Sequence, residues 1–284
     1  MVINHIVVAT DESDAGRQAV RTAVAVAART GARVTVMRAV AASGAVLSGV
    51  PRVESVADEA AESSVERLRR WVGDDAPAWE DASIEHAPPV SFAVTYGLPG
   101  VEIGRFAERE RADLLVLGRK PRSRMARLVV GDTADAVARR SLLPCLFVPG
   151  PGALPRTVLV AVDGTERGMA VFTAGVQFAL QIGAELHFVT VEPRRPDERA
   201  DSAAAVPTAR SIQLSAQVRS VEGGHLEVRR GAAVEEILAA AHERRPDVLV
   251  IGCHRGGPPG IIDAGSTARR LAHTASCATL TVPL

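Results

Sequence analysis

Three features of the sequence predict an α/β protein made of two tandem copies of one unit. An apolar, β-branched segment that ends in an acidic residue occurs twice, ending once at Asp11 and once at Asp163. A second pair of apolar segments ends at Gly118 and Gly252, and stretches of helical periodicity separate these segments in both copies. Apolar strands that alternate with helices are typical of a parallel sheet covered on both faces. We therefore predict two five-stranded parallel sheets, each flanked by helices.

The first copy contains the expected elements in a regular order. Residues 4–10 form an unbroken apolar run, which indicates a buried strand. The helix expected at residues 13–30 carries an apolar face and ends before Gly31, because glycine commonly terminates a helix. That face comprises Ala19, Ala23, Val26 and Ala27. The remaining elements are expected as strand 33–40, helix 53–72, a strand within 84–96, helix 100–110, strand 114–117, helix 133–140 and strand 145–148.

The second copy repeats this order with a change of spacing. Its strands are expected near residues 158–162, 185–191, 226–229, 248–251 and 279–282. Asp11 and Asp163 lie further apart in the sequence than Gly97 and Gly231 do. The first copy is therefore the longer one, and its additional residues lie before Gly97. Residues 149–155 are rich in proline and glycine, as linkers often are. We expect domains at residues 1–150 and 156–284.

The amino-acid composition argues against some classes of binding partner. The chain has 284 residues, of which 47% are hydrophobic and 3% aromatic, and its 33 basic residues equal its 33 acidic ones. Balanced charge and few aromatic side chains argue against nucleic-acid binding. The three cysteines form no CxxC pair, no apolar run is long enough to span a membrane, and no leader-like segment opens the sequence. We expect a cytoplasmic protein with neither nucleic-acid nor membrane partners.

Ligands of open parallel sheets bind at the carboxyl ends of the strands, and the first such place here is the turn after the first strand. This turn reads Asp163-Gly164-Thr165 in the second copy and begins with Asp11 in the first. It lacks the GxGxxG pattern of dinucleotide-binding turns. Two interpretations stay open for the acid, since an aspartate here could cap the following helix, contact a ligand, or do both.

The loop after the fourth strand is the second such place. In the second copy it is rich in glycine and leads into Gly265-Ser266-Thr267 at the start of a helix, where backbone amides favour a phosphate. The first copy keeps the same spacing from Gly118 to Gly131, but cations and a proline replace the glycines and Asp132 replaces the serine. A carboxylate at this position weakens the case for a phosphate in the first copy.

These motifs, in this order and occurring twice, resemble the universal stress protein family across essentially the whole chain. The resemblance implies two tandem Rossmann-like (adenine nucleotide alpha hydrolase-like) domains. Many members bind ATP through the pattern Gly-x2-Gly-x9-Gly-Ser/Thr. In the second copy, Arg255 stands at the middle glycine position and Gly256 follows it. The arginine could clamp a phosphate or fill the space that the ligand needs.

By the same resemblance, Asp163 contacts the adenosine part of the ligand, the backbone around Val191 flanks adenine, and the glycines of the loop lie near ribose and phosphates. The implied nucleotide site of the second copy comprises Asp163, Gly164, Thr165, Val191, Gly252, Arg255, Gly256, Gly265, Ser266 and Thr267. Weaker counterparts in the first copy are Asp11, Gly118, Gly131 and Thr133, because Pro121 replaces the middle glycine there and cannot donate an amide hydrogen.

The sequence favours a stress-response regulatory protein that binds ATP or a related adenine nucleotide in its second copy without efficient turnover. The alternative is a nucleotide-free protein-interaction module of the same fold. An enzyme is the weakest of the three hypotheses, since no nucleophile elbow or P-loop occurs and no general base or metal-binding carboxylate is evident at the loop. Asp163 is the single acid considered for Mg²⁺. We expect no catalytic residue and no metal site.

The resemblance also bears on partners. The last strand of each copy resembles the edge strands through which family domains pair, which predicts an intramolecular pseudo-dimer of the two copies or a homodimer. Residues 119–127 hold five cations without an acid, and they are either a site for an anion or an acidic protein partner or a solvated loop. The sequence identifies no particular protein partner.

Overall fold

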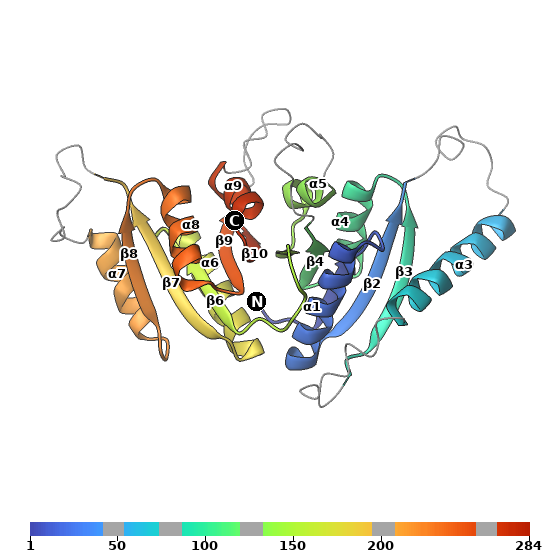
Figure 1. Ribbon diagram of the computed structural model, residues 1–284, viewed down its shortest axis with the longest axis horizontal. Coiled ribbons are helices and arrows are strands. Elements are labelled where there is room, and N and C mark those ends of the chain that lie inside the picture. The colour runs from blue at the N-terminus through green and yellow to red at the C-terminus, as the bar shows by residue number, and fades with distance from the viewer. Residues whose placement is uncertain (42–53, 74–86, 120–132, 195–207, 254–265) are drawn as a thin grey trace. The chain divides into compact units, whose positions relative to one another are not determined.

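The computed structural model describes residues 1–41, 54–73, 87–119, 133–194, 208–253 and 266–284. The chain divides into two compact units (Figure 1). The first unit is Ile3–Leu154, and the second is Pro155–Leu284 together with Met1–Val2.

The first unit alternates strands and helices throughout its described length. Its elements are β1 (His5–Ala9), α1 (Asp14–Thr30), β2 (Arg33–Val40), α3 (Glu54–Gly73), β3 (Val90–Tyr96), α4 (Pro99–Arg109), β4 (Leu114–Gly118), α5 (Thr133–Arg140) and β5 (Cys145–Val148). The strand order is β3-β2-β1-β4-β5, and every neighbouring pair in this order is parallel. The order reverses at β1, where Ala9 is opposite Met37 on β2 and Leu117 on β4.

The second unit repeats this topology. Its elements are β6 (Thr157–Ala161), α6 (Glu166–Ile182), β7 (Glu185–Glu192), α7 (Ala209–Arg219), β8 (His225–Arg230), α8 (Ala233–Arg244), β9 (Val248–Cys253), α9 (Ser266–Thr274) and β10 (Ala278–Pro283). The order β8-β7-β6-β9-β10 is again parallel between neighbours, with the reversal at β6. The predicted fold class is confirmed.

The greater length of the first unit is explained by the connection between β2 and β3. The ends of β2 and β7 lie further apart in the sequence than the ends of β3 and β8 do. The additional residues of the first unit therefore lie in this connection. It contains α3, with 20 residues, where the second unit has α7, with 11. Beyond it the units match closely, since Gly97 and Gly231 both have φ of 150° and a Cβ on either would lie 2.7 Å from a glutamate side chain.

Local sequence signals account for most element boundaries. The predicted apolar face of α1 is buried at all four positions, and Gly31 ends the helix with φ of 74° while its N–H donates to the Ala27 carbonyl. The third strand is shorter than the expected range, because it begins at Val90, directly after Pro88 and Pro89. Pro89 has no N–H to donate, but its carbonyl accepts from the N–H of Val34.

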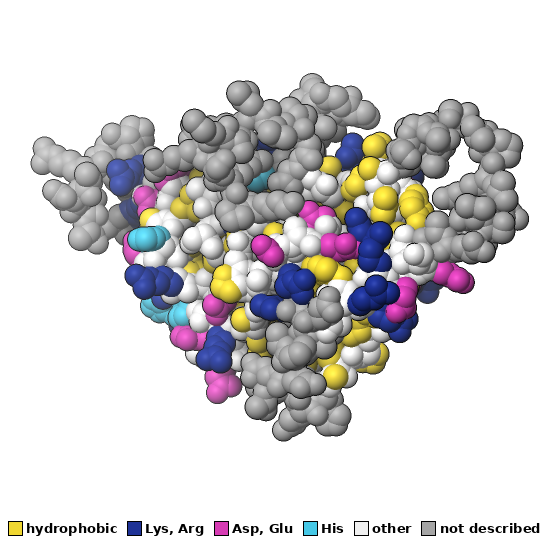
Figure 2. Space-filling model, turned by 45° about the vertical axis from the view of Figure 1, so that its right-hand side comes forward, with side chains coloured by type: hydrophobic (Ala, Val, Ile, Leu, Met, Phe, Trp, Pro, Cys, Tyr) yellow, Lys and Arg dark blue, Asp and Glu magenta, His cyan; other side chains and the backbone are white. Residues whose placement is uncertain are grey.

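The described surface carries charges of both signs. Figure 2 shows cationic and anionic side chains interspersed on one face of the molecule. Among the helices that the structure describes, none is both long and apolar enough to cross a membrane.

Candidate functional site

The turn after β6 is organised by Asp163 and Thr165. The Oδ1 atom of Asp163 accepts from the Thr165 N–H at 3.0 Å and from the Thr165 hydroxyl at 2.7 Å. Thr165 is the N-cap of α6, and its Oγ1 accepts from the Gly168 N–H at 3.0 Å. The suggestion that the aspartate caps the helix is therefore wrong, because the hydroxyl residue two positions later supplies the cap and the aspartate orients that hydroxyl.

The first unit builds the same turn with two substitutions, Glu12 for Gly164 and Ser13 for Thr165. Ser13 caps α1 by accepting from the Gly16 N–H, and Asp11 accepts from the Ser13 N–H at 3.1 Å and from its hydroxyl. The residue between acid and cap has positive φ in both units, 60° at Glu12 and 67° at Gly164. The Glu12 carboxylate pairs with Arg38 on β2.

A glycine lies in the first turn of each helix, and in α6 it lets the carboxylate of Asp163 approach closely. A Cβ on Gly168 would lie 2.2 Å from Oδ1 of Asp163, and a Cβ on Gly16 would lie 2.3 Å from Oγ1 of Thr10 and 3.4 Å from Oδ1 of Asp11. In the second unit no side chain fits between the acid and the helix start, whereas in the first unit the close neighbour of the glycine is the Thr10 hydroxyl. The carboxylate therefore lies at the positive end of the helix dipole, which stabilises its negative charge.

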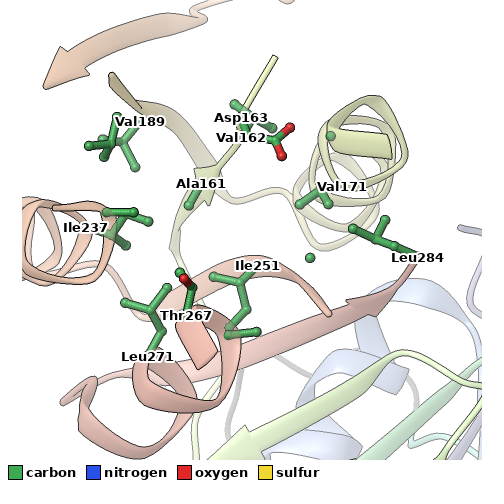
Figure 3. Close-up of a pocket in the computed structure, with 15 residues that line it drawn as sticks. Ala161, Val162, Asp163, Val171, Val189, Ile237, Ile251, Thr267, Leu271 and Leu284 are labelled. Atoms are coloured by element: carbon green, nitrogen blue, oxygen red, sulfur yellow. The ribbon is translucent and has the colours of Figure 1, made fainter. Parts of the chain in front are cut away.

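A pocket of about 420 Å³ lies at the carboxyl ends of β6, β7 and β9, beside the starts of α8 and α9 (Figure 3). Its lining comes from segments far apart in the sequence. The residues are Ala161, Val162, Asp163, Gly168, Val171, Val189, Val191, Ala233, Ile237, Ile251, Gly252, Thr267, Ala268, Leu271 and Leu284. A volume of this size, in the range of small-molecule sites, makes the pocket the leading candidate for a ligand.

The pocket is apolar with one charged group. Asp163 is the single charged residue in the described lining, and Thr267 is the single hydroxyl residue. Figure 3 shows Val189 and Ile237 on one side of the pocket and Val171 and Leu284 on the other. Asp163 is exposed, and its hydrogen bonds to described residues all use Oδ1. Its Oδ2 atom therefore has the capacity to accept from a ligand hydroxyl or amine.

The structure brings four predicted site residues to this pocket: Asp163, Val191, Gly252 and Thr267. Gly164 and Thr165 form the adjoining turn but do not line the pocket, and Ser266 begins α9. The other three, Arg255, Gly256 and Gly265, lie outside the described residues.

Sequence reasoning missed most of the apolar lining. Val171, Ile237 and Leu271 belong to amphipathic helices, where such residues predict core packing and give no sign of a cavity. The one available signal was position, since a residue near the carboxyl end of a parallel strand or in the first two turns of the next helix is close to the ligand edge.

Gly252 is packed more tightly than its place in a phosphate pattern implies. A Cβ on Gly252 would lie 2.6 Å from Cδ1 of Leu284 and 2.8 Å from Cγ2 of Val171. Its counterpart Gly118 is packed against backbone, since a Cβ there would lie 2.2 Å from the Ala15 carbonyl oxygen. Both glycines are thus explained by close packing as well as by any ligand.

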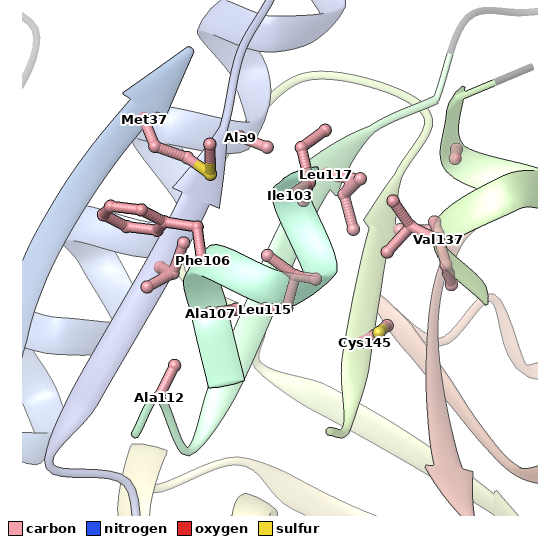
Figure 4. Packing of buried hydrophobic residues seen from close by; sticks show 13 residues of the cluster. Ala9, Met37, Ile103, Phe106, Ala107, Ala112, Leu115, Leu117, Val137 and Cys145 are labelled. Atoms are coloured by element: carbon pink, nitrogen blue, oxygen red, sulfur yellow. The ribbon is translucent and has the colours of Figure 1, made fainter. Parts of the chain in front are cut away.

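On the β2 side, the first unit has a larger side chain than the second at the equivalent place, Met37 for Val189. Ala9, Met37, Leu117 and Val137 belong to one buried cluster, which also contains Phe106 (Figure 4). At the matching positions the second unit has the smaller residues Val189 for Met37 and Ala240 for Phe106, but the larger Leu271 for Val137. Of the weaker first-unit candidates, Asp11 and Gly118 lie at strand ends, Thr133 begins α5, and Gly131 lies outside the described residues.

A buried ion pair fixes the backbone next to Val191. Glu192 accepts from the N–H and hydroxyl of Thr208, at 3.1 and 2.7 Å, and from Arg230 at 3.2 Å. Burial alone would raise the pKa of Glu192, but the hydrogen bonds from Thr208, Ser211 and Arg230 outweigh it and hold the pKa below its ordinary value. The end of β7 is therefore anchored on the side of the pocket where a base is expected.

Within the described part of the chain, no group of three or more His, Cys, Asp or Glu side chains lies close enough to hold a metal ion. The pocket thus offers one carboxylate, one hydroxyl and apolar walls at the reversal of the strand order. Each unit is a Rossmann-like α/β domain, and the second carries a pocket where such domains bind their ligands.

The family follows from comparison with known proteins. The model of the universal stress protein family matches residues 3–149 and, a second time, residues 155–283. The chain belongs to the universal stress protein family and carries two tandem domains of it.

Individual relatives agree with this assignment. The chain is similar to universal stress protein MJ0531 of Methanocaldococcus jannaschii, with 29% identity over 149 residues that cover 51% of this chain and 82% of the relative. The solved structure of a universal stress protein from Archaeoglobus fulgidus matches 100% of this chain and 99% of its own, with a TM-score of 0.72 and 18% identity. A functionally unknown protein from Pseudomonas aeruginosa PAO1 matches 99% of this chain and 92% of its own, with a TM-score of 0.63 and 16% identity. The two structures support the fold of the whole chain.

Proposed function

We propose that the second unit binds ATP or a related adenine nucleotide in the pocket beside Asp163, as a structural or signalling ligand that is not turned over efficiently. The observation that carries the proposal is the meeting of three distant segments at one pocket. Asp163 follows β6, Gly252 lies near the end of β9, and Thr267 belongs to the first turn of α9. The resemblance to nucleotide-binding members of the family pointed to the same three positions.

The lining suits the parts of an adenine nucleotide. The flat faces of a base can pack against Val189, Val191 and Ile237, whose aliphatic side chains exclude water. Oδ2 of Asp163 can accept from a ribose hydroxyl or from the exocyclic amine. The first N–H groups of α9 are unpaired within the helix and favour an anion.

Slow or absent turnover is consistent with the small number of acidic and basic groups in the described lining of the pocket. Hydrolysis of a phosphoanhydride needs groups that position a water molecule and stabilise developing negative charge. The described lining holds one carboxylate, and its Oδ1 atom is already engaged in orienting the cap of α6. We therefore propose a binding protein in which the ligand changes the stability or the surface of the second unit.

Exchanging Val189 and Met37, which occupy the same strand position in the two units, tests the proposal. Met37 shows that this β-strand position accommodates methionine, so Val189→Met should fold while filling the base side of the pocket. In calorimetric titration with ATP we expect about tenfold weaker binding for Val189→Met, as overpacking by a longer side chain predicts. The mirror substitution Met37→Val in the first unit is the matched control and should leave affinity unchanged.

The alternative function, a nucleotide-free interaction module, has one observation in its favour: Leu284 and Val171 pack directly on Gly252. Denaturing the purified protein and analysing the released small molecules by mass spectrometry separates the two functions. An adenine compound supports nucleotide binding. Its absence, together with no heat of binding for adenosine, AMP or ATP, favours the interaction module.

A further inference from the structure

Leu284 contributes a wall of the pocket from directly beyond β10. Its backbone is held in place, because its N–H donates to the Cys253 carbonyl at 3.1 Å. Its side chain is partly buried and lines the pocket. A substitution at this position therefore changes the wall while the hydrogen bond that anchors the chain is kept.

The Leu284 side chain covers one of the glycines in the ligand loop pattern. Together with Val171 it packs on Gly252, with Cδ1 2.6 Å from where a Cβ on that glycine would lie. By the spacing that relates Gly118 to Gly252, the first unit has Gly150 at the position of Leu284, and a glycine has no side chain with which to cover Gly118. The apolar wall is thus specific to the second unit.

The wall lies on the side of the pocket away from the expected base. In Figure 3, Leu284 and Val171 face the pocket from one side, and Val189 and Ile237 line the other. A nucleotide whose base rests on Val189 would extend its phosphate chain toward the remaining walls. A phosphate that leaves water needs donors or cations, and the side chains of Leu284 and Val171 supply neither.

We propose that Leu284 is a specificity-determining residue that limits the length of the ligand, so that the pocket favours adenosine or AMP over ATP. This inference rests on the proposed function, since it presupposes that an adenine ligand occupies the pocket. The base and ribose bind between apolar walls and Asp163, while the isobutyl group of Leu284 stands where a longer phosphate chain would cross Gly252.

Calorimetric titrations of adenosine, AMP and ATP into the full chain test this assignment. The variants are Leu284→Ala, Leu284→Met as a conservative replacement, and Leu180→Ala as a control on α6, where the side chain is 69% exposed. We expect wild type to bind adenosine about tenfold more tightly than ATP, a range typical of discrimination by an apolar pocket. Leu284→Ala should reduce that preference by about fivefold, mainly by improving ATP binding, whereas the other two variants should keep it.

The outcomes separate the inference from the proposed function. Equal affinity of wild type for adenosine and ATP, or an unchanged preference in Leu284→Ala, overturns the role of Leu284 while nucleotide binding stands. If no adenine ligand binds wild type or Leu284→Ala, the proposed function fails and the inference fails with it. Thermal denaturation of each variant verifies that it is folded before affinities are compared.

Discussion

One carboxylate oxygen of Asp163 binds Thr165 twice, because Oδ1 of Asp163 accepts from both the N–H and the hydroxyl of Thr165. Asp11 and Ser13 repeat this relationship in the first unit. The acid therefore has a structural role in both units, which is to orient the hydroxyl that caps the next helix. In the second unit the acid also lines the pocket, so one side chain both orients the cap of α6 and faces the pocket.

Removing the cap should destabilise the second unit. Thr165→Ala removes the oxygen that accepts from the Gly168 N–H, and loss of such a cap costs about 1 kcal/mol. Thr165→Ser retains the hydroxyl and should remain close to wild type. Urea denaturation followed by circular dichroism measures both. Equal stability of the alanine and serine variants would show that the cap contributes nothing.

Asp163→Asn should separate the two roles of the acid. The amide oxygen can still accept from Thr165, so α6 remains capped, but the negative charge toward the pocket is lost. We expect about tenfold weaker binding of adenosine, since hydrogen bonds to charged groups are the stronger ones. The loss of stability should be similar to that of Asp11→Asn, which removes the equivalent charge at the start of α1. Asp11→Asn is the matched control, and binding that falls equally in both variants would contradict a site in the second unit.

Two glycines should respond oppositely to alanine. Gly164 has φ of 67°, where a Cβ costs about 1–2 kcal/mol, so Gly164→Ala should lower the free energy of unfolding. Gly104 lies inside α4, and a Cβ there meets nothing within 4 Å. Gly104→Ala should raise stability by about 0.5–1 kcal/mol, because alanine loses less backbone entropy in a helix. Thermal melts that move in the same direction for both variants would refute this assignment of strain.

Stability should depend on pH through His5. This side chain is buried, with Nδ1 3.1 Å from the Glu110 carbonyl and Nε2 2.8 Å from the Thr35 hydroxyl. Burial lowers the pKa of His5, and it outweighs the raising effect of the Glu110 carbonyl. The unfolded chain therefore takes up a proton before the folded protein does, near the ordinary histidine value of about 6.5.

Stability is accordingly full above that pH and falls as the pH is lowered through it, by no more than about 1.4 kcal/mol per pH unit for one group. Urea denaturation between pH 7.5 and 5.5 should show this loss in wild type and a smaller one in His5→Gln. His225→Gln, on the exposed start of β8, is the control and should behave as wild type. An identical pH dependence in His5→Gln would exclude His5 as its source.

The sequence was sufficient for the architecture because the signals of an α/β fold are local and were present twice. Apolar runs located the strands, and the bounds of β2, α5 and β5 agree with the expected ones. The two spacings between copies located the insertion, which the structure confines to the connection that contains α3. Pro88 and Pro89 interrupt the range expected for the third strand, and β3 begins directly after them.

The site was less predictable, because a cavity depends on side-chain volumes that meet in three dimensions. Val189 and Met37 both predict a buried strand, and their difference in size matters once Ile237 and Leu271 are placed around the pocket. Leu284 carries no motif, so its contact with Gly252 was invisible in the sequence. The roles of acid and hydroxyl in the turn were likewise decided by geometry.

Equilibrium dialysis of the full chain against labelled adenosine and labelled ATP tests the central claim most directly, because it counts sites. We predict one adenine ligand per chain at saturation. At a fixed ligand concentration near the wild-type Kd, the number bound per chain should fall severalfold in Val189→Met and stay at the wild-type value in Met37→Val. Two ligands per chain, or none, would contradict a single adenine site in the pocket of the second unit.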